Sequence, residues 1–221
     1  LGEKPLYYGW LGERFVFASE LKAIRTLPGF VDDVDPQALS QLLHWAHIQA
    51  PLTIHRQLRK LRAGELIHVR PEAAPSRPVR YWQIEQAVQA GLDRPFAGSL
   101  DAAADELEAL LGRAVGEQMQ ADVPVGAFLS GGIDSSLVVA LMQRQSARTV
   151  NTFSIGFGES EFDESHHARR VAQHLGTDHT ELYVTPQQAL DVIPRLPCMY
   201  DEPFSDSSQI PTYLVCAMAR R

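Results

Sequence analysis

The feature that most constrains the fold is an alternation of short apolar segments with helical patterns between residues 123 and 184. Apolar or β-branched runs predict buried strands at Val123–Leu129, Val150–Phe157 and Thr180–Val184. The segments between them predict helices around Leu137–Met142 and over Asp163–Leu175. Strands that alternate with helices at this spacing form βαβ units, so the sequence predicts an α/β fold built on a parallel sheet.

The part of the chain before residue 99 carries a different pattern. Leu6–Trp10 and Arg14–Ser19 are rich in aromatic and β-branched residues and flank a short glycine-containing turn, which predicts a β-hairpin. Asp35 followed by Pro36 is typical of a helix N-cap and first turn. A further strand is expected at Glu65–Val69.

Prolines within residues 71–80 mark the only shift in composition along the chain. Because proline fixes φ and lacks an amide hydrogen, this stretch predicts an extended linker. Beyond it, apolar residues recur at three- and four-residue steps over Leu100–Met119, which predicts an amphipathic helix. We therefore expect one domain over residues 1–75, a linker over 76–98 and a second domain over 99–221.

Composition argues against several classes of protein. Residues 1–80 carry 11 Lys and Arg against 8 Asp and Glu, whereas residues 81–221 carry 9 against 19. Nucleic-acid binding needs clustered cations, so we expect no nucleic-acid partner. The longest apolar runs fall short of the roughly 18 residues of a membrane span, so no membrane partner is expected either. Two cysteines and no opening signal peptide favour a cytoplasmic protein.

The chemistry concentrates in Phe128–Ser136, at the carboxyl end of the first predicted strand in the α/β region, where open α/β sheets bind ligands. Gly131 and Gly132 allow backbone angles closed to other residues and a close approach by an anion. The amides at the following helix N-terminus favour phosphate, and the serines add hydroxyl donors. Asp134 would repel phosphate unless a cation intervened, so it is the expected Mg²⁺ ligand.

Two familiar phosphate loops do not match this segment. A P-loop needs Gly-Lys-Ser/Thr, and no lysine follows Lys60 in the chain. The dinucleotide-binding fingerprint needs a third glycine where Ser135 stands. The remaining alternative is a tight strand-to-helix turn whose serines are incidental.

The segment Ser130–Ser135 resembles the pyrophosphate-binding loop of the N-type ATP pyrophosphatases, which cleave ATP between its α and β phosphates. Val123–Gly126, Phe153–Phe157 and Asp201–Ser208 narrow the resemblance to glutamine-hydrolysing asparagine synthetases. Residues 2–8 and 18–22 resemble the last strands of that family's glutaminase domain. The resemblance implies a doubly wound, HUP-like parallel sheet preceded by the β-rich C-terminal part of an Ntn-type glutaminase domain.

The resemblance also implies a reaction. ATP and aspartate would give a β-aspartyl-adenylate and pyrophosphate, and ammonia from glutamine would then displace AMP to give asparagine. ATP and Mg²⁺ are the implied cofactors, the partners are these small-molecule substrates, and a homodimer is left open. Ser130 and Asp134 are the catalytic candidates, and by motif position the ATP-binding residues are Leu129, Ser130, Gly131, Gly132, Ile133, Asp134, Ser135, Ser136 and Ile155.

An acidic cluster at Asp201, Glu202 and Asp206 has two interpretations. It is either a solvated loop or, as the resemblance implies and as we prefer, part of the substrate side of the nucleotide and acceptor pocket. Metal binding by the adjacent His166 and His167 is disfavoured, because neighbouring residues on a helix point about 100° apart.

The resemblance leaves parts of the family's machinery unaccounted for. Its cysteine nucleophile has no match here, because Cys198 and Cys216 are expected to be buried structural residues. Its synthetase lysine has no match either, because no lysine follows Lys60. We therefore expect an internal fragment that by itself neither hydrolyses glutamine nor makes asparagine. The alternatives are a relative that forms another amide, such as a β-lactam, macrolactam or sugar amide, and a noncatalytic nucleotide-binding relative.

Overall fold

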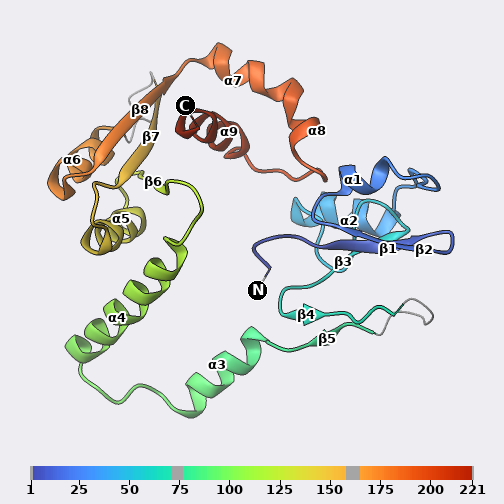
Figure 1. Cartoon of the computed structure of the whole chain (residues 1–221), viewed down its shortest axis with the longest axis horizontal. Coiled ribbons are helices and arrows are strands. Elements are labelled where there is room, and N and C mark those ends of the chain that lie inside the picture. The colour runs from blue at the N-terminus through green and yellow to red at the C-terminus, as the bar shows by residue number, and fades with distance from the viewer. Residues whose placement is uncertain (1, 71–76, 158–164, 221) are drawn as a thin grey trace. The chain divides into compact units, whose positions relative to one another are not determined.

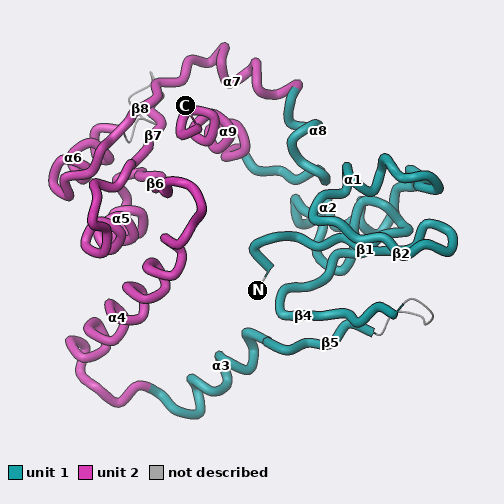
Figure 2. Tube along the Cα trace, in the orientation of Figure 1, with its two compact units in different colours: residues 1–95, 195–206 teal, residues 96–194, 207–221 magenta. Residues whose placement is uncertain are grey.

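The computed structural model describes residues 2–70, 77–157 and 165–220. The chain forms two compact units, residues 1–95 with 195–206 and residues 96–194 with 207–221 (Figure 2). The first unit contains antiparallel strands and short helices, and the second contains a parallel sheet with helices (Figure 1). The protein therefore has the mixed α/β structure that the sequence predicts.

The first unit is built on a three-stranded antiparallel sheet. Strand β1 (Tyr7–Leu11) lies between β2 (Arg14–Ala18) and β3 (Leu58–Lys60). The predicted hairpin is confirmed: Leu11 pairs with Arg14 across a two-residue turn, in which Gly12 adopts a φ of +63°. That angle suits glycine, and short hairpin turns require it.

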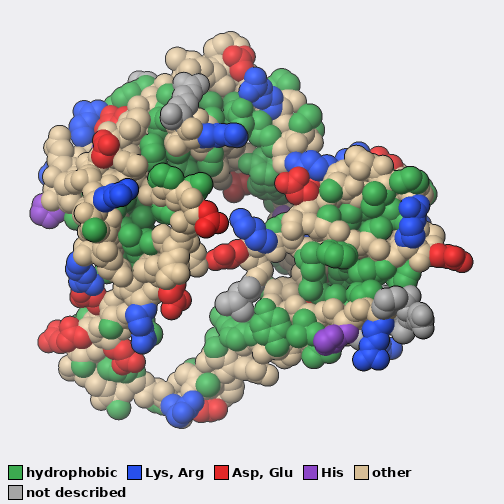
Figure 3. Space-filling view, in the orientation of Figure 1, with side chains coloured by type: hydrophobic (Ala, Val, Ile, Leu, Met, Phe, Trp, Pro, Cys, Tyr) green, Lys and Arg blue, Asp and Glu red, His purple; other side chains and the backbone are tan. Residues whose placement is uncertain are grey.

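Side chains alternate between the two faces of this sheet. Tyr7 and Leu11 of β1 enter a core with Leu21, Ile24 and Leu58. On the other face, hydrophobic side chains of β1 and β2 reach the surface (Figure 3), and Trp10 and Phe17 are 42% and 69% exposed. The core of this unit therefore lies on one side of the sheet only.

The remaining elements of the first unit are short. Asp35 caps one of the helices as predicted, because its carboxylate accepts a hydrogen bond from the Gln37 amide at 2.8 Å. These elements are α1 (Leu21–Arg25), α2 (Pro36–Trp45), β4 (Glu65–Leu66), β5 (Val79–Arg80), α3 (Ile84–Asp93) and α8 (Leu196–Met199).

The connection predicted over residues 76–98 contains regular structure. Residues 71–76 lie outside the described residues, but β5 pairs with β4 and α3 occupies ten residues of the predicted linker. Ile84, Val88 and Leu92 follow one another at four-residue steps, which is a helical period. The proline-rich composition just before them obscured this signal.

The second unit contains the predicted parallel sheet. Its strands β6 (Gly126–Phe128), β7 (Asn151–Phe157) and β8 (Asp178–Val184) are adjacent in that order and run parallel. Between them the chain forms α5 (Ile133–Gln145) and α6 (Ser165–Leu175). Leu129, Val139, Ala168 and Ala172 make the buried core between these helices and the sheet.

Helices before and after the sheet complete this unit: α4 (Leu100–Gln118), α7 (Pro186–Val192) and α9 (Gln209–Ala219). A 3₁₀ turn at Ile193–Arg195 follows α7, and its last residue begins the segment assigned to the first unit. The helix predicted to begin at Asp163 is described only from Ser165, since Asp163 and Glu164 lie outside the described residues. Thr185 caps α7 in a capping box with Gln188.

Both cysteines differ from expectation, because Cys198 and Cys216 are exposed rather than buried. Each lies in an apolar stretch of sequence, but its helix turns the thiol side outward. Within the described ranges, every helix is too short or too polar to cross a membrane.

Candidate functional site

The segment Ser130–Ser136 forms a compact turn between β6 and α5. The Ser130 and Ser135 hydroxyls share a hydrogen bond of 2.9 Å, and the Ser130 amide also donates to Ser135 Oγ at 3.3 Å. The Gly132 amide donates to Ser130 Oγ, also at 3.3 Å. Hydrogen bonds of the serine hydroxyls thus stabilise the conformation of the turn, which accounts for the repeated serines in so short a loop.

The two glycines of the turn play different parts. Gly131 adopts a φ of +82°, which side chains with a Cβ rarely adopt, whereas Gly132 precedes α5 at a φ of −71° that any residue can adopt. A Cβ on Gly131 would lie 2.6 Å from the Ala168 nitrogen and 2.7 Å from His167 Cβ. The turn therefore needs glycine at 131 to pack directly on the backbone of α6.

A cavity of about 230 Å³ opens beside this turn, at the carboxyl end of β6. Strand β6 ends at Phe128, while β7 continues to Phe157, so the edge of β7 beyond Phe153 faces the cavity. The wall is mostly apolar, and it is completed by α6 and α9. It consists of Phe128, Leu129, Ser130, Phe153, Ser154, Ile155, Phe157, Ser165, Ala168, Pro211, Thr212 and Val215.

Ser154, in the cavity wall, is tied to β8 through the partly buried His179. His179 Nε2 lies 3.2 Å from Ser154 Oγ, and His179 Nδ1 lies 2.9 Å from Thr152 Oγ1. Thr152 shares a further hydrogen bond of 2.9 Å with Thr177. Burial lowers the pKa of His179, so the neutral imidazole with one donor and one acceptor nitrogen is the form that fits this network.

Ser165, another residue of the cavity wall, is fixed in a similar way. Its hydroxyl shares a hydrogen bond of 2.8 Å with the Tyr183 hydroxyl, which also accepts one from Arg169. Arg169 in turn makes a two-pronged ion pair with Glu181 and thereby holds the pKa of that carboxyl below its usual range. Two polar groups of the cavity are thus positioned by side chains of β8.

The structure brings together some of the predicted ATP-binding residues. Leu129, Ser130 and Ile155 line the same cavity. Gly131 and Ser136 line a neighbouring groove between α5 and α6. The remaining members of the set are in the turn or the first turn of α5, with Ile133 and Asp134 exposed.

The loop offers Mg²⁺ a partial set of ligands. Asp134 supplies one exposed carboxylate, and among the described residues no cluster of three or more His, Cys, Asp or Glu could hold a metal on its own. Mg²⁺ commonly binds through one or two carboxylates together with phosphate oxygens and water. Ser136 Oγ is buried without a hydrogen-bond partner in the described structure. Ser136 lies two residues from Asp134 along α5 and does not share its face, so Asp134 is the single ligand here, which fits Mg²⁺ held mainly by polyphosphate oxygens.

The acidic residues predicted for the substrate side, Asp201, Glu202 and Asp206, lie in the first unit. Both oxygens of Asp201 and both oxygens of Glu202 accept hydrogen bonds from other residues of that unit. Asp206 is the last residue of the segment that belongs to this unit and is exposed. Their predicted place on the substrate side stays a prediction.

The sequence reasoning missed Ser154, Ser165 and His179. One signal was present, because Thr152 and Ser154 place polar groups on one face of an otherwise apolar strand. Polar side chains at two alternate buried positions need partners, and His179 on the next strand supplies them. The sequence alone gives neither the order nor the register of the strands. It therefore could not show that β8 places His179 opposite Thr152.

Comparison with known protein families matches both parts of the chain. The family model described as asparagine synthase matches residues 106–221, and the model described as glutamine amidotransferase domain matches residues 1–82. These two ranges cover most of the sequence and leave residues 83–105 between them unmatched.

Named relatives agree with these matches. A Methanocaldococcus jannaschii protein, whose name assigns it provisionally to the glutamine-hydrolysing asparagine synthetases, is 34% identical over 224 residues, which cover 100% of this chain and 42% of the relative. Asparagine synthetase 1 of Bacillus subtilis is 30% identical over 220 residues, 100% of this chain and 33% of the relative. The chain thus spans between a third and about two fifths of the length of these relatives.

Proposed function

The chain belongs to the asparagine synthase family, and on that premise we propose that it is part of an ATP-dependent ligase that converts aspartate to asparagine. In the proposed reaction the β-carboxylate of aspartate attacks the α-phosphorus of ATP, and pyrophosphate leaves. Ammonia released from glutamine then attacks the β-carbonyl carbon, and AMP leaves with the electrons of the broken C–O bond. Adenylation is needed because a free carboxylate is a poor electrophile.

The single observation that carries the proposal is the position of the turn relative to the cavity. A glycine turn at the start of α5 offers backbone amides for a polyphosphate, and an apolar cavity with a few polar groups opens beside it. We assign the cavity wall around Leu129 and Ile155 to the adenosine and Ser130–Ser136 to the pyrophosphate. The free edge of β7 next to Ile155 suits a planar base that hydrogen-bonds to a strand.

Three groups of the turn have distinct roles in this proposal. Ser130, held by Ser135, would donate its hydroxyl to the departing pyrophosphate. Asp134 would hold Mg²⁺ against the phosphates. When bound, Mg²⁺ neutralises the charge that develops on the leaving pyrophosphate.

The domain organisation follows the same proposal. We assign residues 1–75 to the C-terminal part of a glutaminase domain, 76–98 to the connection, and 99–221 to the first part of a doubly wound, HUP-like synthetase domain. The parallel order β6-β7-β8 with intervening helices supports the last assignment. Of the predicted substrate-side residues, this proposal retains Asp206.

Asp134→Asn in the intact protein tests this function. The variant should release pyrophosphate from ATP and aspartate about 10²–10³-fold more slowly, the usual effect of removing one well-placed electrostatic group. Glutamate release from glutamine should stay close to that of the unmodified protein. Asp178→Asn is the matched control, because this exposed carboxylate lies at the opposite end of the sheet, at the start of β8.

The possible outcomes separate the alternatives. Unchanged pyrophosphate release in Asp134→Asn would contradict the Mg²⁺ role. Equal loss of both activities would show that Asp134 supports the fold. Pyrophosphate release that depends on a carboxylate other than aspartate would identify a relative that forms a different amide.

A further inference from the structure

Residues 195–206 match the synthetase region in sequence but fold with the unit that contains the glutaminase region. They lie inside the range 106–221 that matches the asparagine synthase model. In the structure they form part of the first unit, together with residues 1–95, most of which match the glutamine amidotransferase model. A short piece of the synthetase region is therefore folded into the glutaminase region.

Asp201 makes the first of two carboxylate contacts that hold this piece. Its Oδ2 accepts a hydrogen bond from the Leu21 amide at 2.8 Å, and its Oδ1 accepts one from the Lys22 amide at 3.1 Å. These are the first two amides of α1, which lack acceptors within the helix, and Glu20 at the N-cap provides none from its side chain. A carboxylate far along the sequence thus caps this helix.

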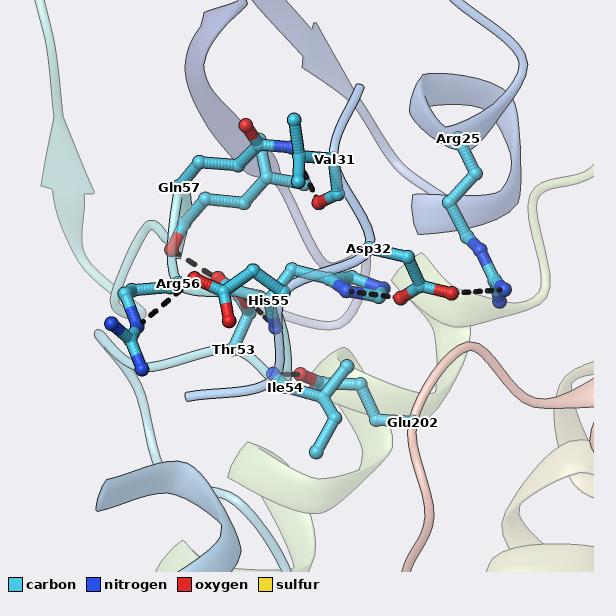
Figure 4. A network of polar contacts seen from close by, with 11 residues as sticks. Arg25, Val31, Asp32, Thr53, Ile54, His55, Arg56, Gln57 and Glu202 are labelled. Atoms are coloured by element: carbon cyan, nitrogen blue, oxygen red, sulfur yellow. Dashed lines mark hydrogen bonds and ion pairs between the residues drawn. The ribbon is translucent and has the colours of Figure 1, made fainter. Parts of the chain in front are cut away.

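Glu202 makes the second contact, in a more buried place. Its Oε2 lies 2.6 Å from Lys60 Nζ, and its Oε1 accepts a hydrogen bond of 2.6 Å from the Ile54 amide (Figure 4). The Lys60 and Glu202 side chains are only 15% and 10% exposed. Lys60 also donates to the Ile48 carbonyl at 2.6 Å, so both buried charges have several partners.

Weaker contacts reinforce both ends of the segment. Lys22 Nζ lies 3.5 Å from the Cys198 carbonyl oxygen and 3.4 Å from that of Met199. At the other end, the Ser205 amide donates to the Ala46 carbonyl at 2.8 Å. Ala46 is the left-handed residue that ends α2, so a carbonyl at the end of a helix finds its partner here.

From these contacts we infer that Asp201 and Glu202 are positioning residues that fasten the synthetase region to the glutaminase region, and that this contact couples glutamine hydrolysis to amide formation. The inference rests on the proposed function. Helix α9 begins three residues after Asp206 and supplies Pro211, Thr212 and Val215 to the cavity wall. The fastened segment 195–206 is thus joined in the sequence, through two residues, to a helix that lines the candidate nucleotide site.

Lys60→Met and Glu202→Gln, each made alone in the intact protein, test the inference. Each leaves one charge of a buried pair without its partner, which destabilises such contacts strongly. Amide formation is measured with glutamine and, separately, with ammonium chloride as the nitrogen source. We expect the glutamine-supported rate to fall on the order of tenfold or more, because breaking a buried pair strongly weakens the contact that it holds. The ammonium-supported rate and glutamate release should both be retained.

The double variant Lys60→Met, Glu202→Gln distinguishes positioning from chemistry. It removes both buried charges and keeps a side-chain oxygen for the Ile54 amide, so the glutamine-supported rate should recover relative to either single variant. Glu13→Gln is the control, since Glu13 is exposed in the β1–β2 turn of the same unit. A soluble but unfolded single variant would lose glutamate release as well, which this measurement detects.

Other outcomes would overturn the inference. Equal loss with both nitrogen sources, without recovery in the double variant, would place Glu202 at the substrate, as the sequence suggested. Unchanged rates in both single variants would show that the contact couples nothing. Absence of ATP- and aspartate-dependent pyrophosphate release in the unmodified protein would instead refute the proposed function itself.

Discussion

Gly131→Ala should damage the second unit more than any other small change in the turn. Alanine at a φ of +82° costs about 1–2 kcal/mol, because its Cβ crowds the following carbonyl. The new methyl would also lie 2.6 Å from the Ala168 nitrogen and 2.7 Å from the His167 carbonyl carbon, which are backbone atoms that cannot rotate away. Overpacking of this kind adds about 1–3 kcal/mol.

The two terms together amount to about 2–5 kcal/mol. For a domain of roughly 100 residues, this lowers the midpoint of thermal unfolding by on the order of 10 °C or more. Relief of the clash would require α6 to move away from the turn. That movement would displace Ser165 and Ala168 from the cavity wall, so nucleotide binding should fall together with stability.

Gly132→Ala is the matched control for this prediction. Gly132 has a φ of −71°, and a Cβ there meets only Ser130 Oγ at 3.3 Å. A glycine-to-alanine change at a compatible angle is neutral or stabilises by about 0.4–1 kcal/mol. This variant should therefore keep its unfolding midpoint and lose only affinity for Mg–ATP, because its methyl projects toward the space assigned to the phosphates.

Thermal unfolding followed by circular dichroism and Mg–ATP binding followed by calorimetry would measure both effects. Tryptophan fluorescence would report on the first unit only, since Trp10, Trp45 and Trp82 all lie there. An unchanged midpoint in Gly131→Ala, or equal destabilisation in the two variants, would refute the reasoning.

Two further predictions concern the second unit. Burial lowers the pKa of His179 below 6.5, so between that lowered pKa and pH 6.5 the unfolded chain binds more protons than the folded chain. The stability present above pH 6.5 should therefore be lost as the pH falls through the lowered pKa. In the variant His179→Gln, the stability of β7 and β8, measured by amide hydrogen exchange, should depend less on pH. A pH profile identical to that of the unmodified protein would contradict this prediction. Ser99→Ala should destabilise α4 by about 1 kcal/mol in urea unfolding, because Ser99 Oγ accepts from the Ala102 amide at 3.2 Å; an unchanged midpoint would show that the cap contributes nothing.

Much of the second unit could be predicted from the sequence because its signals are local. Apolar runs of strand length, helical periods between them and the cap at Thr185 each act within a few residues. The predicted strands Val150–Phe157 and Thr180–Val184 lie within one or two residues of β7 and β8. The predicted strand Val123–Leu129 ends within one residue of β6 but begins three residues before it: β6 spans Gly126–Phe128, and the Leu129 amide still donates to the Phe153 carbonyl at 2.9 Å.

The glycine pair shows how far composition alone can lead. The sequence indicates that a Gly-Gly turn needs unusual backbone angles, but only the structure shows that Gly131 has one and Gly132 does not. The deciding contact is with His167 and Ala168, more than thirty positions away in the sequence. Only the fold brings these residues together.

Asp201 and Glu202 show the same limit more strongly. Their partners Leu21, Lys22 and Lys60 lie 142 to 180 positions earlier in the sequence. An acidic loop that binds a substrate and an acidic loop that binds main-chain amides have the same composition, so no local pattern could separate them. The contacts of the structure favour the second role.

The short first strand connects the turn with the cavity. Because β6 ends at Phe128 and the chain enters the Ser130–Ser136 turn after Leu129, no described strand pairs with β7 beyond Phe153 on this side. The same turn therefore provides both the amides that the proposed function assigns to a polyphosphate and the strand edge that it assigns to a base. A longer β6 would pair with Ser154–Phe157 and fill the cavity. In the proposed function, the length of β6, which the glycine turn limits, decides whether a base can reach this edge of β7.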